Sequence, residues 1–84
     1  MPKPRNELGD KNLIAERLKE LRQNSKPKLS QRALAQKLQL LGFDMDKNVI
    51  TRIETNKRYV TDIEIQALSR IFNVSYKFLI DGIE

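Results

Sequence analysis

Large apolar residues recur with helical spacing in five short segments of this 84-residue chain, and no other feature restricts the fold as strongly. The breaks between these segments are only a few residues long. No segment shows the alternation of apolar and polar residues that is typical of a strand, and there is no internal repeat. The sequence therefore predicts an all-α domain in which five helices pack around one small core.

The first two helices are predicted from residues at positions i, i+4 and i+7. The first is expected over about residues 12–24, and the second is expected to begin at Ser30, a good N-cap residue. Gly42 is well placed to end the second helix in a left-handed conformation. Around it we expect an extended helix end followed by a wide turn, with Leu41 and Phe43 packed inward. The other positions expected to be buried are Ile14, Leu18, Leu21, Leu34 and Leu38.

Three further helices follow. The third is expected from Asp46, its cap, to about Thr55, and it ends near Asn56, a residue type that tolerates positive φ. The fourth is expected to open with a capping box formed by Thr61 and Glu64, and the fifth to begin at Ser75. The positions expected to face the core in the last two helices are Ile65, Leu68, Phe72, Phe78 and Leu79.

The basic residues are concentrated in the first two thirds of the chain. Residues 1–58 hold fourteen basic and seven acidic side chains, whereas residues 59–84 hold two and four. This asymmetry favours a polyanionic partner on one side of the molecule and a different contact on the other. Without cysteine, histidine or a glycine-rich phosphate loop, the sequence predicts no metal site, no cofactor and no enzymatic activity. With no membrane-spanning run and no secretory signal, the expected location is cytoplasmic, with no membrane partner.

The third predicted helix separates polar from apolar side chains. At about 100° per residue, Val49, Ile50 and Ile53 fall on one side. The residues on the opposite side are Lys47, Asn48, Thr51, Arg52 and Thr55. Arginine can bond guanine bidentately, asparagine suits adenine, threonine offers a methyl group to thymine, and lysine reaches guanine or a phosphate. This face is a candidate surface for reading base edges, although an ordinary solvated helix face has the same pattern.

The order of these elements resembles the Cro/repressor-type (XRE-like) helix-turn-helix family. The motifs that carry the resemblance are Leu29-Ser30-Gln31, Leu34-Ala35, Ile50-Thr51-Arg52-Ile53-Glu54 and Lys57-Arg58. The resemblance implies a five-helix lambda-repressor-like DNA-binding domain over residues 12–84, with the helix over residues 46–55 in the major groove. Residues 1–11 are predicted to form a flexible arm, whose basic side chains either contact DNA or only add solubilising charge.

The resemblance also implies roles for single residues. The base-reading set is Lys47, Asn48, Thr51 and Arg52. The set that holds the DNA backbone is Gln31, Thr55, Lys57 and Arg58. Gln31 is also expected to brace the recognition helix, and Arg22 and Glu54 are expected to form a structural ion pair. The chain departs from the family between Leu38 and Ile50, where the connection is longer by a turn or more and leaves the angle between the second and third helices open.

Two functions follow from these observations. The first is a sequence-specific regulator of transcription, a repressor, that binds double-stranded DNA as a dimer. The alternative is a helix-turn-helix protein-interaction module, such as an antitoxin or a component of a mobile-element switch. The basic recognition face favours the first. The apolar residues between Tyr76 and Ile83 fit either a homodimer contact through the C-terminal helix or a cap on the bundle.

Overall fold

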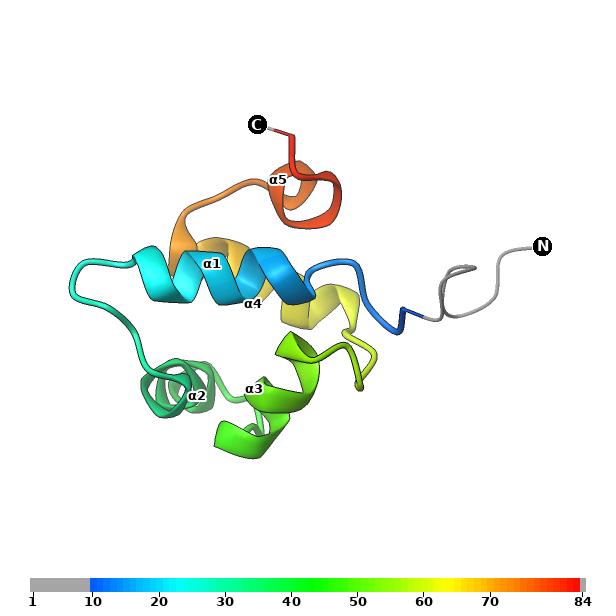
Figure 1. The fold of residues 1–84 in the computed structure, drawn as a ribbon. Coiled ribbons are helices and arrows are strands. Elements are labelled where there is room, and N and C mark those ends of the chain that lie inside the picture. The colour runs from blue at the N-terminus through cyan, green and yellow to red at the C-terminus, as the bar shows by residue number, and fades with distance from the viewer. Residues whose placement is uncertain (1–9, 84) are drawn as a thin grey trace.

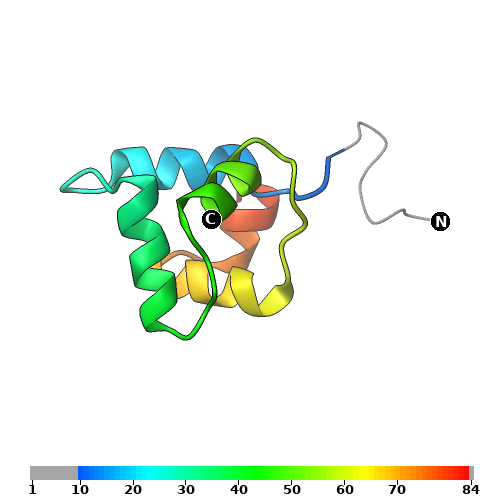
Figure 2. The same cartoon turned by 90° about the horizontal axis from the view of Figure 1, so that it is seen from below.

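The computed structural model describes residues 10–83 and contains five α-helices and no strand in that range. They are α1 (Ala15–Asn24), α2 (Gln31–Leu40), α3 (Lys47–Glu54), α4 (Asp62–Phe72) and α5 (Tyr76–Asp81). In Figure 1, α1 and α4 form a central layer, α2 and α3 lie on one side of it, and α5 lies on the other. Figure 2 shows α2 running crosswise to α1 and α4, with α3 beside it. The predicted all-α, five-helix architecture is confirmed for the described part of the chain.

All five helices and the residues beside them contribute to one core. Its fully buried side chains are Ile14, Leu18, Leu34, Leu38, Ile50, Ile53, Leu68 and Leu79. Around them, Leu21, Ile65 and Phe72 are half-buried and pack against the core. The core positions predicted from helical spacing are therefore confirmed except for Leu41, which is exposed, and Phe78, which is half-buried but does not pack against this core. None of the helices in residues 10–83 has the length and apolar character needed to cross a membrane.

α1 begins at Ala15, three positions after the predicted start at Asn12. The reason is the Asn12 side chain, whose Oδ1 accepts a hydrogen bond from the Ile14 N–H at 3.0 Å. The amide group of the same side chain donates to two carbonyls outside α1. These bonds fix residues 12–14 in a turn, so the helical backbone starts only after Ile14, which occupies the N-cap position.

α2 ends at Leu40, and the prediction that Leu41 packs inward is wrong, because Leu41 is 54% exposed. Gly42 has the predicted positive φ, at 94°. The Phe43 N–H then donates to the Leu38 carbonyl at 3.0 Å, the long bond of a Schellman motif. This motif reverses the chain, so Leu41 lies on the outside of the turn and Phe43 packs against the core.

The lengthened connection from α2 to α3 is anchored rather than loose. Met45, a residue of this connection, is only 2% exposed and packs in the core, whereas Leu41 does not. The Gln39 amide donates to the Met45 carbonyl at 2.6 Å, which ties the end of α2 to the residue just before the α3 cap. These contacts therefore fix the start of α3 relative to the end of α2.

The predicted helix caps are confirmed. Ser30, Asp46 and Ser75 each accept a hydrogen bond at 3.0 Å from the backbone N–H three residues further on. Thr61 and Glu64 form the capping box at the start of α4. Such caps satisfy N–H groups that have no partner inside the helix, and each typically contributes about 1 kcal/mol. Local sequence therefore determines where four of the five helices begin.

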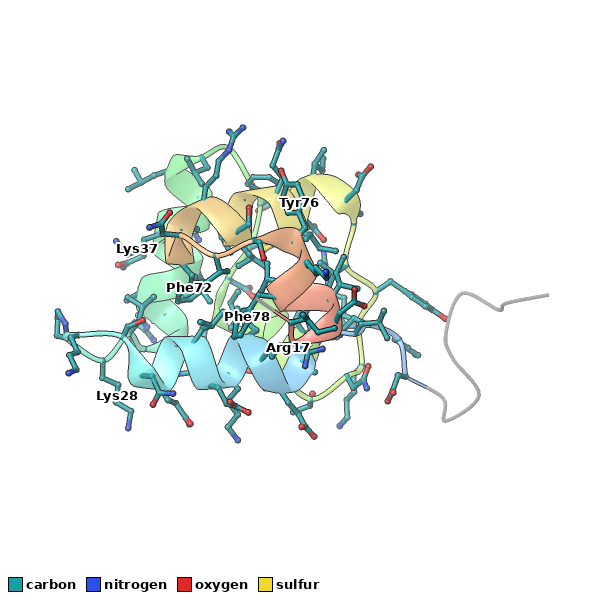
Figure 3. All side chains as sticks on the ribbon, turned by 90° about the horizontal axis from the view of Figure 1, so that it is seen from above. Arg17, Lys28, Lys37, Phe72, Tyr76 and Phe78 are labelled. Carbon is teal, nitrogen blue, oxygen red and sulfur yellow. The ribbon has the colours of Figure 1, made fainter. Side chains whose placement is uncertain are left out.

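Arg17 attaches α5 to α1. Its Nε and Nη2 donate to the carbonyls of Leu79 and Ile80, each at 2.8 Å. A cation at the C-terminal end of a helix also interacts favourably with the helix dipole. In Figure 3, Arg17 and Tyr76 lie on opposite sides of α5, with Tyr76 on the side of α4. The position of α5 is thus set by a polar contact that hydrophobic periodicity did not predict.

Candidate nucleic-acid interface

α3 presents a polar face that the described residues leave uncovered. Ile50 and Ile53 are completely buried, whereas Lys47, Asn48 and Arg52 are exposed. The buried arc is wide enough to hold the helix on the bundle, and the opposite arc is open to solvent. Three of the four side chains that the sequence assigns to base reading are therefore presented together on one short helix.

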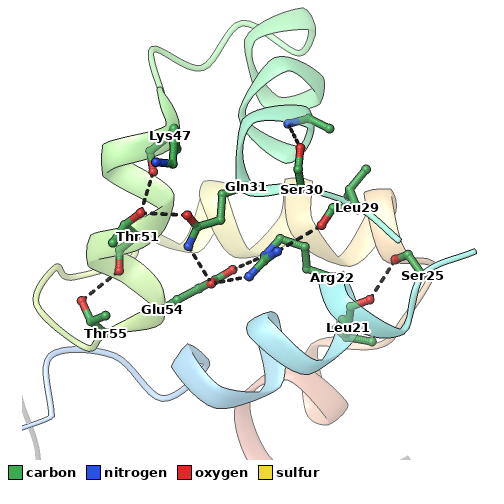
Figure 4. Close-up of polar contacts among 11 residues, drawn as sticks. Leu21, Arg22, Ser25, Leu29, Ser30, Gln31, Lys47, Thr51, Glu54 and Thr55 are labelled. Atoms are coloured by element: carbon green, nitrogen blue, oxygen red, sulfur yellow. Dashed lines mark hydrogen bonds and ion pairs between the residues drawn. The ribbon is translucent and has the colours of Figure 1, made fainter. Parts of the chain in front are cut away.

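A network of polar side chains lies behind α3 (Figure 4). Arg22 donates from Nε to Glu54 Oε2 at 2.7 Å and from Nη2 to Oε1 at 2.9 Å. Its Nη1 donates to the Leu29 carbonyl at 3.1 Å. Gln31 donates from Nε2 to Glu54 Oε1 at 3.0 Å and accepts from the Thr51 hydroxyl at 3.0 Å. The network joins α1, α2 and α3, so the polar face is supported from two neighbouring helices.

The ion pair in this network is shielded from water. The side chains of Arg22 and Glu54 are only 10% and 3% exposed. Because both carboxylate oxygens accept bonds from Arg22, the negative charge of Glu54 is neutralised beside the exposed cations of α3. The geometry contains the ion pair that the resemblance implies, and it places Gln31 where it braces α3.

The hydroxyls of Thr51 and Thr55 bond within the chain. Thr51 Oγ1 lies 3.0 Å from Gln31 Oε1 and 3.1 Å from the Lys47 carbonyl, and its side chain is half-buried. Thr55 Oγ1 donates to the Thr51 carbonyl at 2.8 Å. A hydroxyl has one proton to donate, so neither threonine in this arrangement offers a donor to a ligand. Both differ in this respect from the exposed side chains of Lys47, Asn48 and Arg52.

A basic hollow lies between the first turns of α2 and α3. Its lining residues are Arg22, Ser30, Gln31, Arg32 and Lys47. The N–H groups at the start of α2 and the neighbouring cations give the hollow a positive potential that favours an anion. Sequence reasoning did not select Arg32, although its place directly after Gln31 in the first turn of a capped helix was a usable signal.

The turn after α3 contains two basic residues in different environments. Lys57 is exposed. The Arg58 guanidinium donates to both carboxylate oxygens of Glu64, each at 3.0 Å. Burial works to raise the pKa of the Glu64 carboxyl, but bonds from Arg58 and from the Thr61 N–H outweigh burial and lower it. The same pairing with Glu64 raises the pKa of Arg58. The positive charge of Arg58 is therefore paired with the negative charge of Glu64, whereas Lys57 extends into solvent.

Two asparagines hold the end of α3 against the residues before α1. Asn56 has a φ of 63°, and its Oδ1 accepts the backbone N–H groups of Lys11 at 2.8 Å and Asn12 at 3.0 Å. The Asn12 amide in turn donates to the carbonyls of Ile53 at 3.1 Å and Arg58 at 2.9 Å. Asn12 thus satisfies a carbonyl in the last turn of α3 from outside the helix. Sequence reasoning missed this role, because the two asparagines are 44 positions apart.

The last residues of the segment predicted as a flexible arm contact the folded domain. The Asn56 amide donates to the Asp10 carboxylate, and the Lys11 ammonium lies 5.9 Å from the centre of the Tyr59 ring. Residues 1–9, with the remaining basic side chains of the predicted arm, lie outside the described residues. The chain therefore enters the domain beside the end of α3.

A mostly apolar groove lies between α4 and α5. Its lining residues are Asp62, Ile63, Ile65, Gln66, Tyr76 and Ile80. Ile63 and Tyr76 are 61% and 50% exposed, so residues 10–83 leave the groove uncovered. The basic face of α3 and this apolar groove are thus separated by the central layer of helices.

Comparison with known protein families agrees with this geometry. The model of a helix-turn-helix family matches residues 18–79, about three quarters of the chain. No curated protein and no solved structure gives a significant match. The matched range begins in α1 and ends in α5, so it includes the whole bundle and not only the α2–α3 pair. The chain therefore belongs to the Cro/repressor-type helix-turn-helix family of DNA-binding regulators and has the all-α, lambda-repressor-like fold of that family.

Proposed function

We propose that the chain binds double-stranded DNA sequence-specifically and regulates transcription, with α3 in the major groove. The observation that carries this proposal is the combination of an exposed polar face on α3 with the shielded Arg22–Glu54 pair that holds the helix from behind. Reading base edges requires donors and acceptors on a rigid element, and α3 meets that requirement.

Three exposed side chains of α3 supply complementary contacts to base edges. Arg52 suits the O6 and N7 acceptors of guanine, and Asn48 suits the N6 and N7 groups of adenine. Lys47 stands at the first position of α3 and also lines the basic hollow, so it can reach either a guanine or a phosphate. Together these side chains can contact different bases, and recognition of a specific DNA sequence requires such a mixed set.

Groups at both ends of α3 are placed to hold the DNA backbone. At the start, the basic hollow with Gln31 and Arg32 would receive one phosphate. At the other end, Lys57 extends from the turn, with the partly neutralised Arg58 beside it. Backbone contacts at both ends of a recognition helix fix its register, which base contacts alone do not achieve.

The alternative is a helix-turn-helix that is used only for protein contacts. It gives no role to the exposed cations of α3. The deciding experiment is the selection of bound sequences from a random duplex pool, followed by titration of the selected duplex at several salt concentrations. We expect an enriched consensus and an affinity that falls steeply with salt. If no duplex shows salt-dependent binding, the protein-interaction module is the correct function.

We also propose a homodimer formed through the α4–α5 groove. The groove faces away from α3, so two copies joined there keep both recognition helices exposed. A two-fold axis would place the same apolar patch on both sides of the interface. Residues 59–84 are also acid-leaning, with two basic and four acidic side chains, and this surface is therefore unsuited to DNA.

The dimer proposal is tested by measuring molar mass in solution. Tyr76→Glu places a charge in the groove and should give a monomer. Leu41→Glu places the same charge on another exposed apolar residue, which does not line the groove, and should leave the dimer intact. An unchanged mass for Tyr76→Glu would remove the groove as the interface. A DNA-bound dimer blocks access to the sequence that it covers, so we propose that the protein is a repressor and acts in the cytoplasm. Removal of the protein should then increase transcription of a reporter gene.

A further inference from the structure

The buried ion pair determines the direction of every hydrogen bond that leads from it to Thr51. Arg22 donates to both oxygens of Glu54, and a carboxylate only accepts hydrogen bonds. The group of Gln31 that faces Glu54 at 3.0 Å must therefore be its amide nitrogen, and the amide oxygen faces Thr51. Because an amide oxygen only accepts, the Thr51 hydroxyl must donate to it.

This chain of bonds leaves Thr51 with no proton for a base. Its hydroxyl lies 3.0 Å from Gln31 Oε1 and 3.1 Å from the Lys47 carbonyl, and both neighbours are acceptors within the protein. The Cβ atom of threonine carries only a hydroxyl, a methyl group and a hydrogen. With the hydroxyl proton directed to Gln31 or the helix backbone, the methyl is the apolar group of Thr51 that remains for a ligand.

We propose that Thr51 reads the C5-methyl group of a pyrimidine in the major groove through van der Waals contact of its own methyl group. This inference rests on the proposed function and narrows it to one chemical group, present in thymine and 5-methylcytosine and absent from uracil and cytosine. Thymine presents this methyl group in the major groove, where α3 would lie. Thr51 is half-buried between the exposed Lys47 and Arg52, so it supplies an apolar contact within a polar surface.

The experiment starts from the duplex that the wild-type protein selects from a random pool. Each thymine is replaced in turn by deoxyuridine, which removes only the methyl group. At one thymine in each half-site we expect wild-type binding to weaken about fourfold, which corresponds to about 0.8 kcal/mol for one buried CH₂ group. At that same position cytosine should gain about fourfold on 5-methylation.

Three variants separate the methyl group from the hydroxyl. Thr51→Ser keeps the hydroxyl bonded to Gln31 and removes the methyl, so it should bind the thymine and deoxyuridine duplexes equally at that position. Thr51→Val keeps a methyl and removes the hydroxyl, so it should retain the fourfold discrimination. Thr61→Ser removes a methyl from the N-cap of α4, outside the proposed interface, and should behave as the wild type does.

The outcomes are distinct. If Thr51→Ser retains the same deoxyuridine penalty as the wild type at every thymine, or if no thymine is sensitive, the inference is overturned while the proposed function stands. If the wild type enriches no sequence at all, the proposed function itself fails before any variant is compared. Thermal unfolding of each variant verifies that it is folded, and the wild-type deoxyuridine scan is informative even if one variant is not.

Discussion

Arg22 and Glu54 lie 32 positions apart in the sequence and form the two-point ion pair that fastens α3 to α1. A buried ion pair often gives little more net stability than a well-packed apolar pair, because both charges must leave water. Its value here is orientation: Glu54 is fixed at the end of α3 and in turn fixes Gln31. The same two charges thus anchor α3 and set the direction of the hydrogen bonds behind it.

Removal of one partner of this pair is expected to be costly. Arg22→Ala should lower the free energy of unfolding by about 3–5 kcal/mol, because the Glu54 carboxylate is then left buried without a cation. The combined variant Arg22→Met with Glu54→Leu should lose much less than the sum of the two single changes. Urea unfolding measures Arg22→Ala, the double variant and its two single variants, with Lys19→Ala on the exposed face of α1 as a control. Additive losses would show that the two residues do not act as a pair.

Arg52 and Asn48 are expected to determine sequence preference. Arg52→Ala and Asn48→Ala should each weaken binding to the selected duplex by about 1–3 kcal/mol and relax the preference at one base pair. The measurement is a titration of duplexes altered at single positions, with Lys19→Ala as a control that removes an exposed charge from α1. Equal losses on the selected and on random duplexes would remove these residues from base reading.

Lys57 and Arg58 carry the same charge but should respond differently to substitution. Lys57→Ala is expected to weaken binding to all duplexes alike and to reduce the salt slope by about one. Arg58→Ala removes a guanidinium that is already bonded to Glu64, so it should mainly lower folding stability, by about 1–2 kcal/mol. Anisotropy titrations at several salt concentrations, with urea unfolding in parallel, separate the two effects. An equal change of slope in both variants would mean that the Arg58–Glu64 pair opens on DNA.

Glu64 should contribute to the acid sensitivity of the fold. Its folded pKa lies below the ordinary value of 4.5, so the unfolded chain binds this proton more readily than the folded chain. The stabilisation is therefore fully present above about 4.5 and is lost as the pH falls through the lower folded pKa. Glu64→Gln should flatten this part of the stability curve, measured as unfolding midpoints across the acid range, whereas Glu20→Gln on α1 should leave it steep.

The sequence predicts those parts of the fold that depend on neighbours along the chain. Ser30, Asp46, Thr61 and Ser75 cap their helices as expected, because an N-cap bonds a backbone N–H only three residues away. The prediction that Leu41 packs inward is wrong because it also relied only on spacing along the chain. Helical spacing continues to that residue, but the Gly42 turn reverses the chain before Leu41 can face the core.

The parts of the site that the sequence does not predict depend on side-chain contacts that only the fold creates, most of them between distant residues. The position of Asn12 before α1 gives no sign that its amide caps α3, because Ile53 is 41 positions away. The sequence predicts that Arg58 contacts the DNA backbone. Only the fold shows that its guanidinium is bonded to Glu64. Thr51 reads as a polar base-reading residue, and only the bonds from Arg22 through Glu54 and Gln31 show where its proton is directed.

Arg17 and Arg22 stand on the same helix and hold different parts of the molecule, α5 in one case and α3 in the other. In a dimer joined through the α4–α5 groove, α1 is therefore the rigid spacer between the subunit contact and the base-reading helix. The five positions between these arginines correspond to about 7.5 Å along a helix. One residue inserted between them would turn one arginine by about 100° relative to the other. If the proposed dimer forms, the separation of its two DNA half-sites depends on a helix that need not touch the bases.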